Sequence, residues 1–311
     1  MWSTTLDIDG PVHVAEWGSG PARIVLLHGL GGSHLNWMRV APQLTRHGRV
    51  LAPDLPGFGL SPVAGRRTTV AAYADLLDRF LQQACEGPAI LVGNSMGGLI
   101  ALAEGRRHPE RVAGLVLVDA VLPTPWRRRR APLLALAFWS YLLPPLGRWG
   151  LRRVRDRISV EDLVAGTLRL CAQHPDLIPA DVVAAHVELE RERGRSTEND
   201  AAYVEAAGSI GRALLERARL QRTIRRVTVP TLLVHGASDR LVRVDAARLA
   251  QRHRPDWELH VLDDVGHIPM LEVPHRLFEI LGAWLPTPGL GTPPPLGAAE
   301  PTASQREGAR P

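Results

Sequence analysis

Four short runs of the chain are almost continuously apolar, and each ends at a polar residue. They read IVLLH, AILVGN, GLVLVD and TLLVH and occupy residues 24–28, 89–94, 114–119 and 231–235. A strand with this pattern is covered on both faces, as central strands of a parallel sheet are. Longer amphipathic stretches separate the runs, as crossover helices would. The sequence therefore predicts an α/β fold with a mostly parallel sheet and helices on both faces.

Eight strands are predicted in all, in two blocks. Six lie before residue 120 and two after residue 230, at 4–8, 12–17, 23–28, 49–54, 89–94, 113–119, 231–235 and 258–263. Residues 122–226 contain no convincing strand, and their helical periodicity predicts a helical cap inserted after strand six. The predicted core has two parts, residues 1–121 and 227–285, and the cap between them spans residues 122–226. The Pro- and Gly-rich tail at 286–311 is expected to be disordered.

The most specific local motif is GNSMGG at residues 93–98, between a predicted strand and a helical stretch. A G-x-S-x-G motif in this strand-turn-helix context is a nucleophile elbow. Its serine occupies a strained turn, where side chains at the flanking glycines would collide with the backbone. A glycine-rich turn that happens to contain serine is the alternative, but the flanking elements favour a nucleophile at Ser95.

A serine hydroxyl needs a base that takes its proton and an acid that orients the base. Asp239 follows the seventh predicted strand in the loop GASD, and His267 follows the eighth in GHIP. Because catalytic groups gather at the carboxyl ends of parallel strands, both residues can converge with Ser95. Asp119, at the end of the sixth strand, is the alternative acid, although a turn at the entry to the cap also explains it.

Five blocks of the sequence occur in an order typical of one family. They are HGLGG at 28–32, DLPGFGLS at 54–61, the elbow at 93–98, GASD at 236–239 and GHIP at 266–269. With Ser, Asp and His in that order, the chain resembles the α/β-hydrolase fold superfamily, in its cap-bearing branch, over residues 4–285. The resemblance implies that Ser95 is the nucleophile, His267 the general base and Asp239 its orienting acid. It also implies an oxyanion hole formed by the backbone N–H groups of Leu30 and Met96.

Other polar residues of these blocks are expected to hold loops in place. His28 and His235 each precede a glycine at a strand end, where a histidine can fix a loop by hydrogen bonds, and His28 is also a candidate pocket residue. Asp54 and Ser61 are interpreted as stabilising the turn after strand four. Asp263 and Asp264, two further acidic residues, lie too close to His267 to reach its ring easily and are interpreted as turn residues.

The charge of the chain is concentrated in the predicted cap. The net charge is +5, every basic residue other than histidine is an arginine, and residues 122–226 hold 19 Arg against 12 Asp and Glu. No recognition motif for nucleic acid accompanies these arginines, so nucleic acid is not the expected partner. They flank an apolar run that includes Phe138 and Trp139. This pattern favours a cap helix that packs its apolar face above the active site while its arginines are solvated. Phe138 and Trp139 are then candidate residues of a pocket for a hydrophobic acyl or aryl group. Weak association of this segment with an anionic membrane surface is the alternative.

Metal ions and cofactors are not expected. The 12 histidines include no H-x-x-x-H or H-E-x-x-H pair, and a chain without lysine cannot form a P-loop. The two cysteines fit a reducing compartment. Because the first residues lack a signal-peptide pattern and no apolar segment reaches about 18 residues, we expect a cytoplasmic protein, peripheral at the membrane if the cap binds lipid.

The resemblance implies hydrolysis of a carboxylic ester through an acyl-enzyme. Haloalkane dehalogenases and epoxide hydrolases are similar overall but have an Asp nucleophile where this chain has Ser95. Carbon-carbon bond hydrolases of ring-cleavage products share the GNSMGG elbow, but they typically follow the catalytic histidine with Trp, where Ile268 stands here. A cofactor-free haloperoxidase or perhydrolase would use the same triad. A non-catalytic ligand sensor on this scaffold would not need one.

Overall fold

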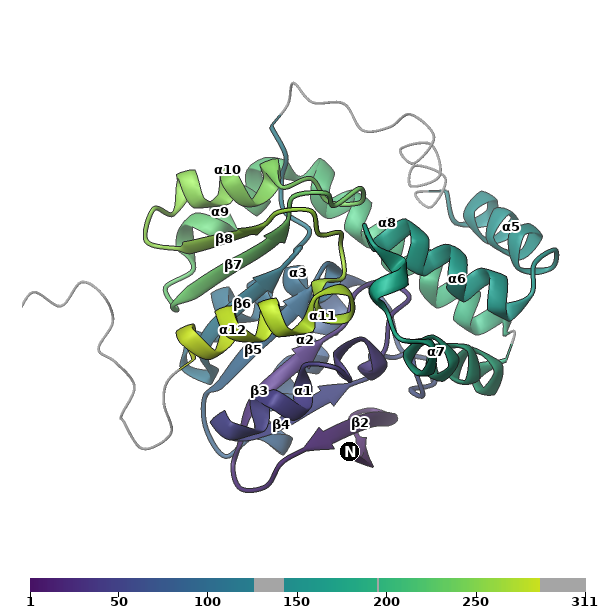
Figure 1. Cartoon of the computed structure of the whole chain (residues 1–311), viewed down its shortest axis with the longest axis horizontal. Helices are drawn as coiled ribbons and strands as arrows, with labels where there is room; N and C mark the ends of the chain where they lie inside the picture. The colour runs from purple at the N-terminus through teal and green to yellow at the C-terminus, as the bar shows by residue number, and fades with distance from the viewer. Residues whose placement is uncertain (126–142, 195, 286–311) are drawn as a thin grey trace, which may run out of the picture.

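A single eight-stranded sheet forms the centre of the molecule (Figure 1). The computed structural model describes residues 1–125, 143–194 and 196–285. The strands are β1 (Trp2–Asp7), β2 (Pro11–Trp17), β3 (Ala22–Leu27), β4 (Arg49–Pro53), β5 (Ala89–Asn94), β6 (Val112–Val118), β7 (Thr231–Gly236) and β8 (Glu258–Leu262). They lie in the order β1-β2-β4-β3-β5-β6-β7-β8. Only the pairs β1–β2 and β2–β4 are antiparallel, which confirms the predicted mostly parallel sheet.

Alternate residues of the central strands enter two hydrophobic clusters, one on each face of the sheet. In β3, Val25 and Leu27 point into one cluster, whereas Ile24 and Leu26 point into the other. This period of two explains why the strands read as continuous apolar runs. Full burial of each such side chain contributes about 1.5–3 kcal/mol relative to exposure. Hydrophobic packing therefore covers both faces of the sheet, and the candidate site lies at the carboxyl ends of its strands.

Helices cover both faces of the sheet (Figure 1). The first face is covered by α2 (Val70–Ala84), α3 (Met96–Arg107), α9 (Arg217–Arg226) and α10 (Asp245–His253). The second face is covered by α1 (Ala41–Leu44), α11 (Pro269–Glu272) and α12 (Pro274–Trp284). Short 3-10 helices are η1 (His34–Trp37), η2 (Thr45–His47), η3 (Pro109–Arg111) and η4 (Pro175–Leu177). Helix α2 begins where the Thr69 side chain accepts a hydrogen bond from the Ala72 N–H, a cap typically worth about 1 kcal/mol.

The predicted helical insertion after strand six is confirmed. It contains α5 (Pro144–Arg155), α6 (Val160–Cys171), α7 (Ala180–Arg193) and α8 (Thr197–Leu215), which stand beside the sheet in Figure 1. Helix α9 also lies within 122–226, but it packs against α3 and α10 of the core. Phe138 and Trp139, two predicted pocket residues, lie outside the described residues, as does the predicted tail 286–311.

Candidate active site

Ser95 stands in a strained turn between β5 and α3. Its backbone angles are φ 55° and ψ −114°, a left-handed conformation that costs a residue with a side chain about 1–3 kcal/mol. The flanking glycines are required sterically, because a Cβ on Gly93 would lie 2.4 Å from the Gly97 carbonyl oxygen and a Cβ on Gly97 would lie 2.3 Å from that of Leu27. Helix α3 begins at Met96, directly after the serine. The local geometry is that of the predicted elbow.

Asp239 and His267 are joined by a buried hydrogen bond. His267 Nδ1 lies 2.7 Å from Asp239 Oδ2. The other carboxylate oxygen, Oδ1, accepts the backbone N–H groups of Leu241 and Val242 at 2.7 and 2.9 Å. Burial alone would raise the pKa of Asp239, but His267, its hydrogen bonds and the nearby His235 outweigh burial and lower that pKa. The ionised carboxylate therefore fixes the proton of His267 on Nδ1 and leaves Nε2 as an acceptor.

Asp119 lies beside this pair, but the hydrogen bond of His267 goes to Asp239. Asp119 Oδ1 accepts the Gly236 N–H at 2.8 Å, and Oδ2 has no hydrogen-bond partner among the described residues. Complete burial and the charge of Asp239 raise the pKa of Asp119 well above its ordinary value. The pKa values of the two neighbouring carboxyl groups are therefore shifted in opposite directions, upward for Asp119 and downward for Asp239. This difference favours Asp239 as the acid that orients the histidine.

The loop of His267 is tied to the elbow on one side and to the cap on the other. Asn94 Nδ2 donates to the His267 carbonyl at 3.0 Å, and the His267 N–H donates to the Cys171 carbonyl at 2.6 Å. The buried carboxylate of Glu272 accepts N–H groups from Gly266 at 2.9 Å and from cap residues 173 and 174. This role of Glu272 is not among the sequence predictions. A single acidic residue inside the apolar run IPMLEV is the pattern that indicates a buried carboxylate there.

The turn at residues 29–32 lies against the elbow. The Gly32 N–H closes it by donating to the Gly29 carbonyl at 3.1 Å, and a Cβ on Gly29 would approach the Ser95 Cβ to 3.0 Å. Leu30 lines the same cavity as Ser95, and Met96 is buried at the start of α3. Both predicted oxyanion-hole residues thus flank the serine near a helix N-terminus, whose positive end favours an anion. Their donation to a reacting oxygen stays a prediction.

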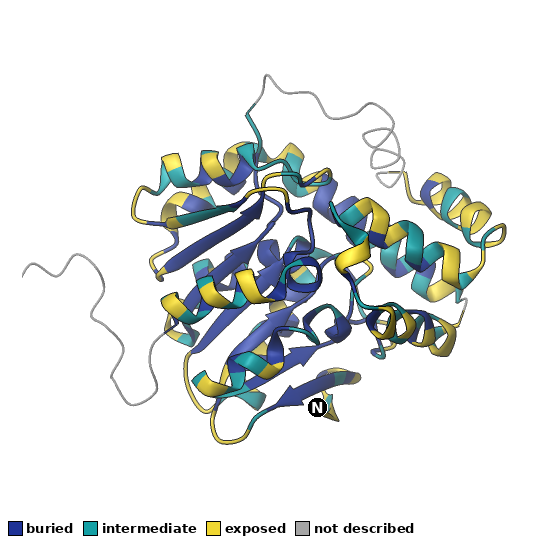
Figure 2. Ribbon diagram, viewed as in Figure 1, coloured by how far each residue is buried: buried dark blue, intermediate teal, exposed yellow. Residues whose placement is uncertain are grey.

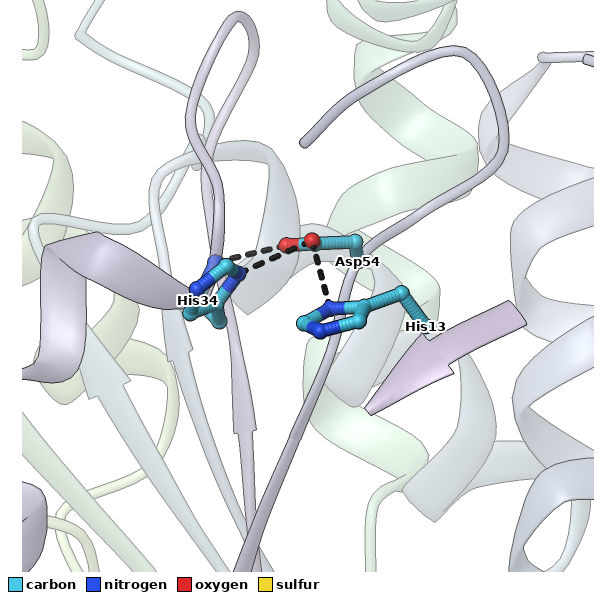
Figure 3. Close-up of side chains that lie close together, drawn as sticks. All are labelled: His13, His34 and Asp54. Atoms are coloured by element: carbon cyan, nitrogen blue, oxygen red, sulfur yellow. Dashed lines mark hydrogen bonds and ion pairs between the residues drawn. The ribbon is translucent and has the colours of Figure 1, made fainter. Parts of the chain in front are cut away.

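A buried carboxylate fastens the loop that carries this turn (Figure 3). Asp54 Oδ2 accepts from Nδ1 of His13 at 3.0 Å, Nδ1 of His34 at 2.9 Å and the Leu60 N–H at 2.9 Å, while Oδ1 accepts the His34 N–H at 2.7 Å. Burial opposes its charge, but these partners lower the pKa of Asp54 well below its ordinary value. The Ser61 hydroxyl accepts the His13 N–H at 2.8 Å. The turn role predicted for Asp54 and Ser61 is therefore confirmed, and the two histidines extend it across β2 and η1.

His28 and His235 hold loops by hydrogen bonds, as predicted. His28 Nδ1 donates to the Gly29 carbonyl at 2.8 Å, and its Nε2 accepts the Leu55 N–H at 3.0 Å. His235 Nε2 donates to the Val242 carbonyl at 2.8 Å. Burial lowers the pKa of both histidines. The structure does not place His28 in the pocket, because the ring is fully buried and both of its nitrogens serve the loops.

A cavity of about 840 Å³ lies between the core and the cap, and both Ser95 and His267 line it. This volume is typical of a site for a small molecule. Large apolar side chains of the cap form much of its wall, namely Leu151, Leu163, Val164, Leu168, Leu170, Leu189, Ile210 and Leu214. Of its charged groups, Arg193 is paired with Glu190 at 2.6 Å. The cavity that Ser95 lines therefore has a largely apolar wall on the side of the cap.

Two groups of possible metal ligands lie near the site, and hydrogen bonds within the chain occupy most of their carboxylate oxygens, Asp119 Oδ2 being the exception. They are His13, His34 and Asp54, and Asp119, Asp239 and His267. Asp54 accepts four hydrogen bonds and Asp239 three, so their carboxylate oxygens already have partners. Ser95, His267 and Asp239 all line one cavity, and the hydrogen bond between His267 and Asp239 is made there.

Comparisons with known proteins agree with the fold. The model of the alpha/beta hydrolase family matches residues 24–280. A pimeloyl-[acyl-carrier protein] methyl ester esterase of Aromatoleum aromaticum is 33% identical over 259 residues, 81% of this chain and 93% of the esterase. A 2-hydroxy-6-oxo-2,4-heptadienoate hydrolase of Pseudomonas putida is 30% identical over 273 residues, 84% of this chain and 88% of the hydrolase. The crystal structure of Cfl2 from Burkholderia cenocepacia has a TM-score of 0.73 at 24% identity and covers 91% of this chain and 95% of its own. The chain belongs to the alpha/beta hydrolase family.

Proposed function

We propose that the protein is a serine hydrolase that cleaves a carboxylic ester with a hydrophobic acyl or aryl group. The observation that carries the proposal is the buried hydrogen bond between Asp239 and His267, at the wall of the cavity that also holds Ser95 in its strained turn. A methyl ester esterase among the relatives supports the class of reaction.

The proposed reaction proceeds through an acyl-enzyme. Ser95 Oγ attacks the ester carbonyl while His267 Nε2 takes its proton, and Asp239 stabilises the resulting imidazolium. The N–H groups of Leu30 and Met96 stabilise the oxyanion, a contribution of about 3–4 kcal/mol per donor in other hydrolases. His267 then protonates the leaving alcohol. In the second half of the cycle His267 takes a proton from water as the water attacks the acyl carbon, the bond from that carbon to Ser95 Oγ breaks, and the imidazolium returns its proton to Ser95 as the acid is released. Every proton in this cycle passes through one imidazole.

Covalent labelling tests the nucleophile. A fluorophosphonate probe should label the intact protein, and Ser95→Ala should abolish the label, because the probe forms its bond with an activated serine. Ser3→Ala, on the exposed edge strand β1, is the matched control and should label as wild type does. A protein that takes up no label, or a Ser95→Ala variant that labels fully, would show that the mechanism is wrong.

The apolar wall of the cavity supports the choice of substrate. Eight leucine, isoleucine and valine side chains of the cap line the cavity that Ser95 also lines, so medium-chain or aryl esters should have a higher kcat/KM than acetate. A series of p-nitrophenyl esters of increasing acyl length measures this. If acetate is the best substrate of the series, the hydrophobic class is rejected while the labelling result still stands.

Carbon-carbon bond hydrolysis is the second candidate, because a relative 30% identical is a 2-hydroxy-6-oxo-2,4-heptadienoate hydrolase. Ile268, directly after His267, differs from the Trp typical of that group and favours ester hydrolysis. Loss of the absorbance of this dienoate in the presence of the enzyme, faster than hydrolysis of any ester in the series, would favour the second candidate.

A further inference from the structure

Helix α5 presents large apolar side chains to solvent. Most of the α5 ribbon is coloured as exposed or intermediate in Figure 2. In the part of the chain that the structure describes, four of the most exposed large hydrophobic residues lie in this helix or directly before it. They are Leu143, Leu146, Trp149 and Val154, with exposed fractions of 62%, 49%, 57% and 53%. Exposed apolar side chains gathered on one element mark a surface that binds something.

The opposite side of α5 is already in use. Gly147 is buried, Leu151 lines the cavity, and the helix packs against α8. Arg155 on this inner side forms an ion pair with Asp200 of α8 at 2.7 Å. The helix is therefore fixed to the cap by one side, and the side chains of Leu146 and Trp149 are exposed rather than packed against the described residues.

Positive charge borders the outer side. Arg148 and Arg153 are exposed, and the Arg153 guanidinium lies 5.0 Å from the centre of the Trp149 ring. Arg152 is exposed as well, 3.7 Å from Asp200. Residues 144–155 contain no Asp or Glu. Trp and Leu on one side of a helix with Arg beside them are the pattern of a helix that lies in a membrane interface.

We propose that α5 docks onto the surface of a bilayer rich in anionic lipids. Leu146 and Trp149 enter the boundary between head groups and acyl chains, while Arg148 and Arg153 bind the head-group phosphates. Because Leu151 of the same helix lines the cavity, docking brings the cavity next to the lipid phase. None of the helices that the structure describes has the length and apolarity needed to span a bilayer. The proposal does not rest on the proposed reaction.

Flotation of the full chain with lipid vesicles tests this. The protein should float with vesicles of phosphatidylglycerol and phosphatidylcholine but not with phosphatidylcholine alone, and salt at about 0.5 M should release it because the Debye length shortens. Leu146→Ala with Trp149→Ala should lower the partition coefficient at least about tenfold. Replacing Arg148 and Arg153 by Gln should lower it about fivefold for each arginine.

Matched controls separate docking from general stickiness and from catalysis. Leu215→Ala, at an equally exposed leucine of α8, and Arg222→Gln, at an exposed arginine of α9, should leave flotation unchanged. Ser95→Ala should float as wild type does, so the result is independent of the reaction. Absence of binding to anionic vesicles, or binding unaffected by the α5 variants, overturns the proposal. So does a dimer in sedimentation that the Leu146 and Trp149 variants dissociate, because a second copy would then cover the face.

Discussion

Because of Glu104, the free energy of unfolding should fall as the pH rises from about 4.5 to about 7. This residue of α3 is completely buried, and neither carboxyl oxygen has a hydrogen-bond partner among the described residues. Burial first, and then the like charge of Asp78 on α2, raise the pKa of Glu104 to about 7. Arg107 and Arg111 oppose that rise, and the charge of Glu110 adds to it. Glu104 therefore keeps its proton in the folded protein at pH values where the unfolded chain has lost it.

The sign and magnitude follow from linkage. The unfolded chain ionises at about pH 4.5 and the folded chain at about pH 7, so raising the pH between these values removes protons from the unfolded state only and favours it. At 1.36 kcal/mol per pH unit, the folded protein loses about 3 kcal/mol of stability over this interval. Below pH 4.5 the contribution is fully present, and above pH 7 the loss is complete.

Urea unfolding at a series of pH values from 5 to 8 measures the effect. Glu104→Gln keeps the shape of the side chain but cannot ionise, so its free energy of unfolding should rise relative to wild type by about 2.5 kcal/mol between pH 5 and pH 8. Glu279→Gln, on the exposed side of α12, is the matched control and should follow the wild-type pH dependence. A stability difference between Glu104→Gln and wild type that is the same at every pH would refute the reasoning.

Three further predictions concern the site. Asp239→Asn should lower kcat/KM for the best ester by about 10³- to 10⁴-fold, because the imidazolium loses its charged partner. Asp119→Asn should lower kcat/KM by less than about tenfold. If Asp119→Asn has the larger effect, Asp119 is the acid. Glu272→Gln should lower kcat several-fold with KM nearly unchanged, because it weakens the hydrogen bonds from backbone N–H groups that hold the loop of His267. A rise in KM with kcat unchanged in steady-state kinetics would contradict this. Gly97→Ala should lower the free energy of unfolding by about 3 kcal/mol or more, because its Cβ would lie 2.3 Å from the Leu27 carbonyl oxygen; a urea midpoint equal to wild type would show that the elbow is looser than described.

The strands and the elbow could be predicted because their signals are local. A strand buried on both faces is apolar at nearly every position, so a run of consecutive apolar residues shows where it lies in the sequence. The strained turn at Ser95 likewise needs glycines two residues before and after it, and both are visible in the sequence. The order of the blocks along the chain then indicated which residues meet at the carboxyl edge.

The polar network around the site could not be predicted in the same way. His13, His34 and Asp54 meet from three different segments, and each is a common residue in an unremarkable local context. Glu272 joins the histidine loop to the cap by hydrogen bonds to backbone groups, which leave no trace in the partner residues' identities. Such networks depend on the distance between segments after folding, and no periodicity or spacing encodes that distance.

The hydrogen bonds that join the loop of His267 to the cap constrain how this protein could be recombined with its relatives. The His267 N–H is bound to the Cys171 carbonyl, and Glu272 spans from Gly266 to residues 173 and 174. A chimera that exchanges the cap helices has to keep the backbone of residues 171–174 in the same place, because its one acceptor and two donors position the loop of His267. These residues should therefore stay with the core in any such exchange, and substitutions meant to change the substrate range are better placed elsewhere in the cap.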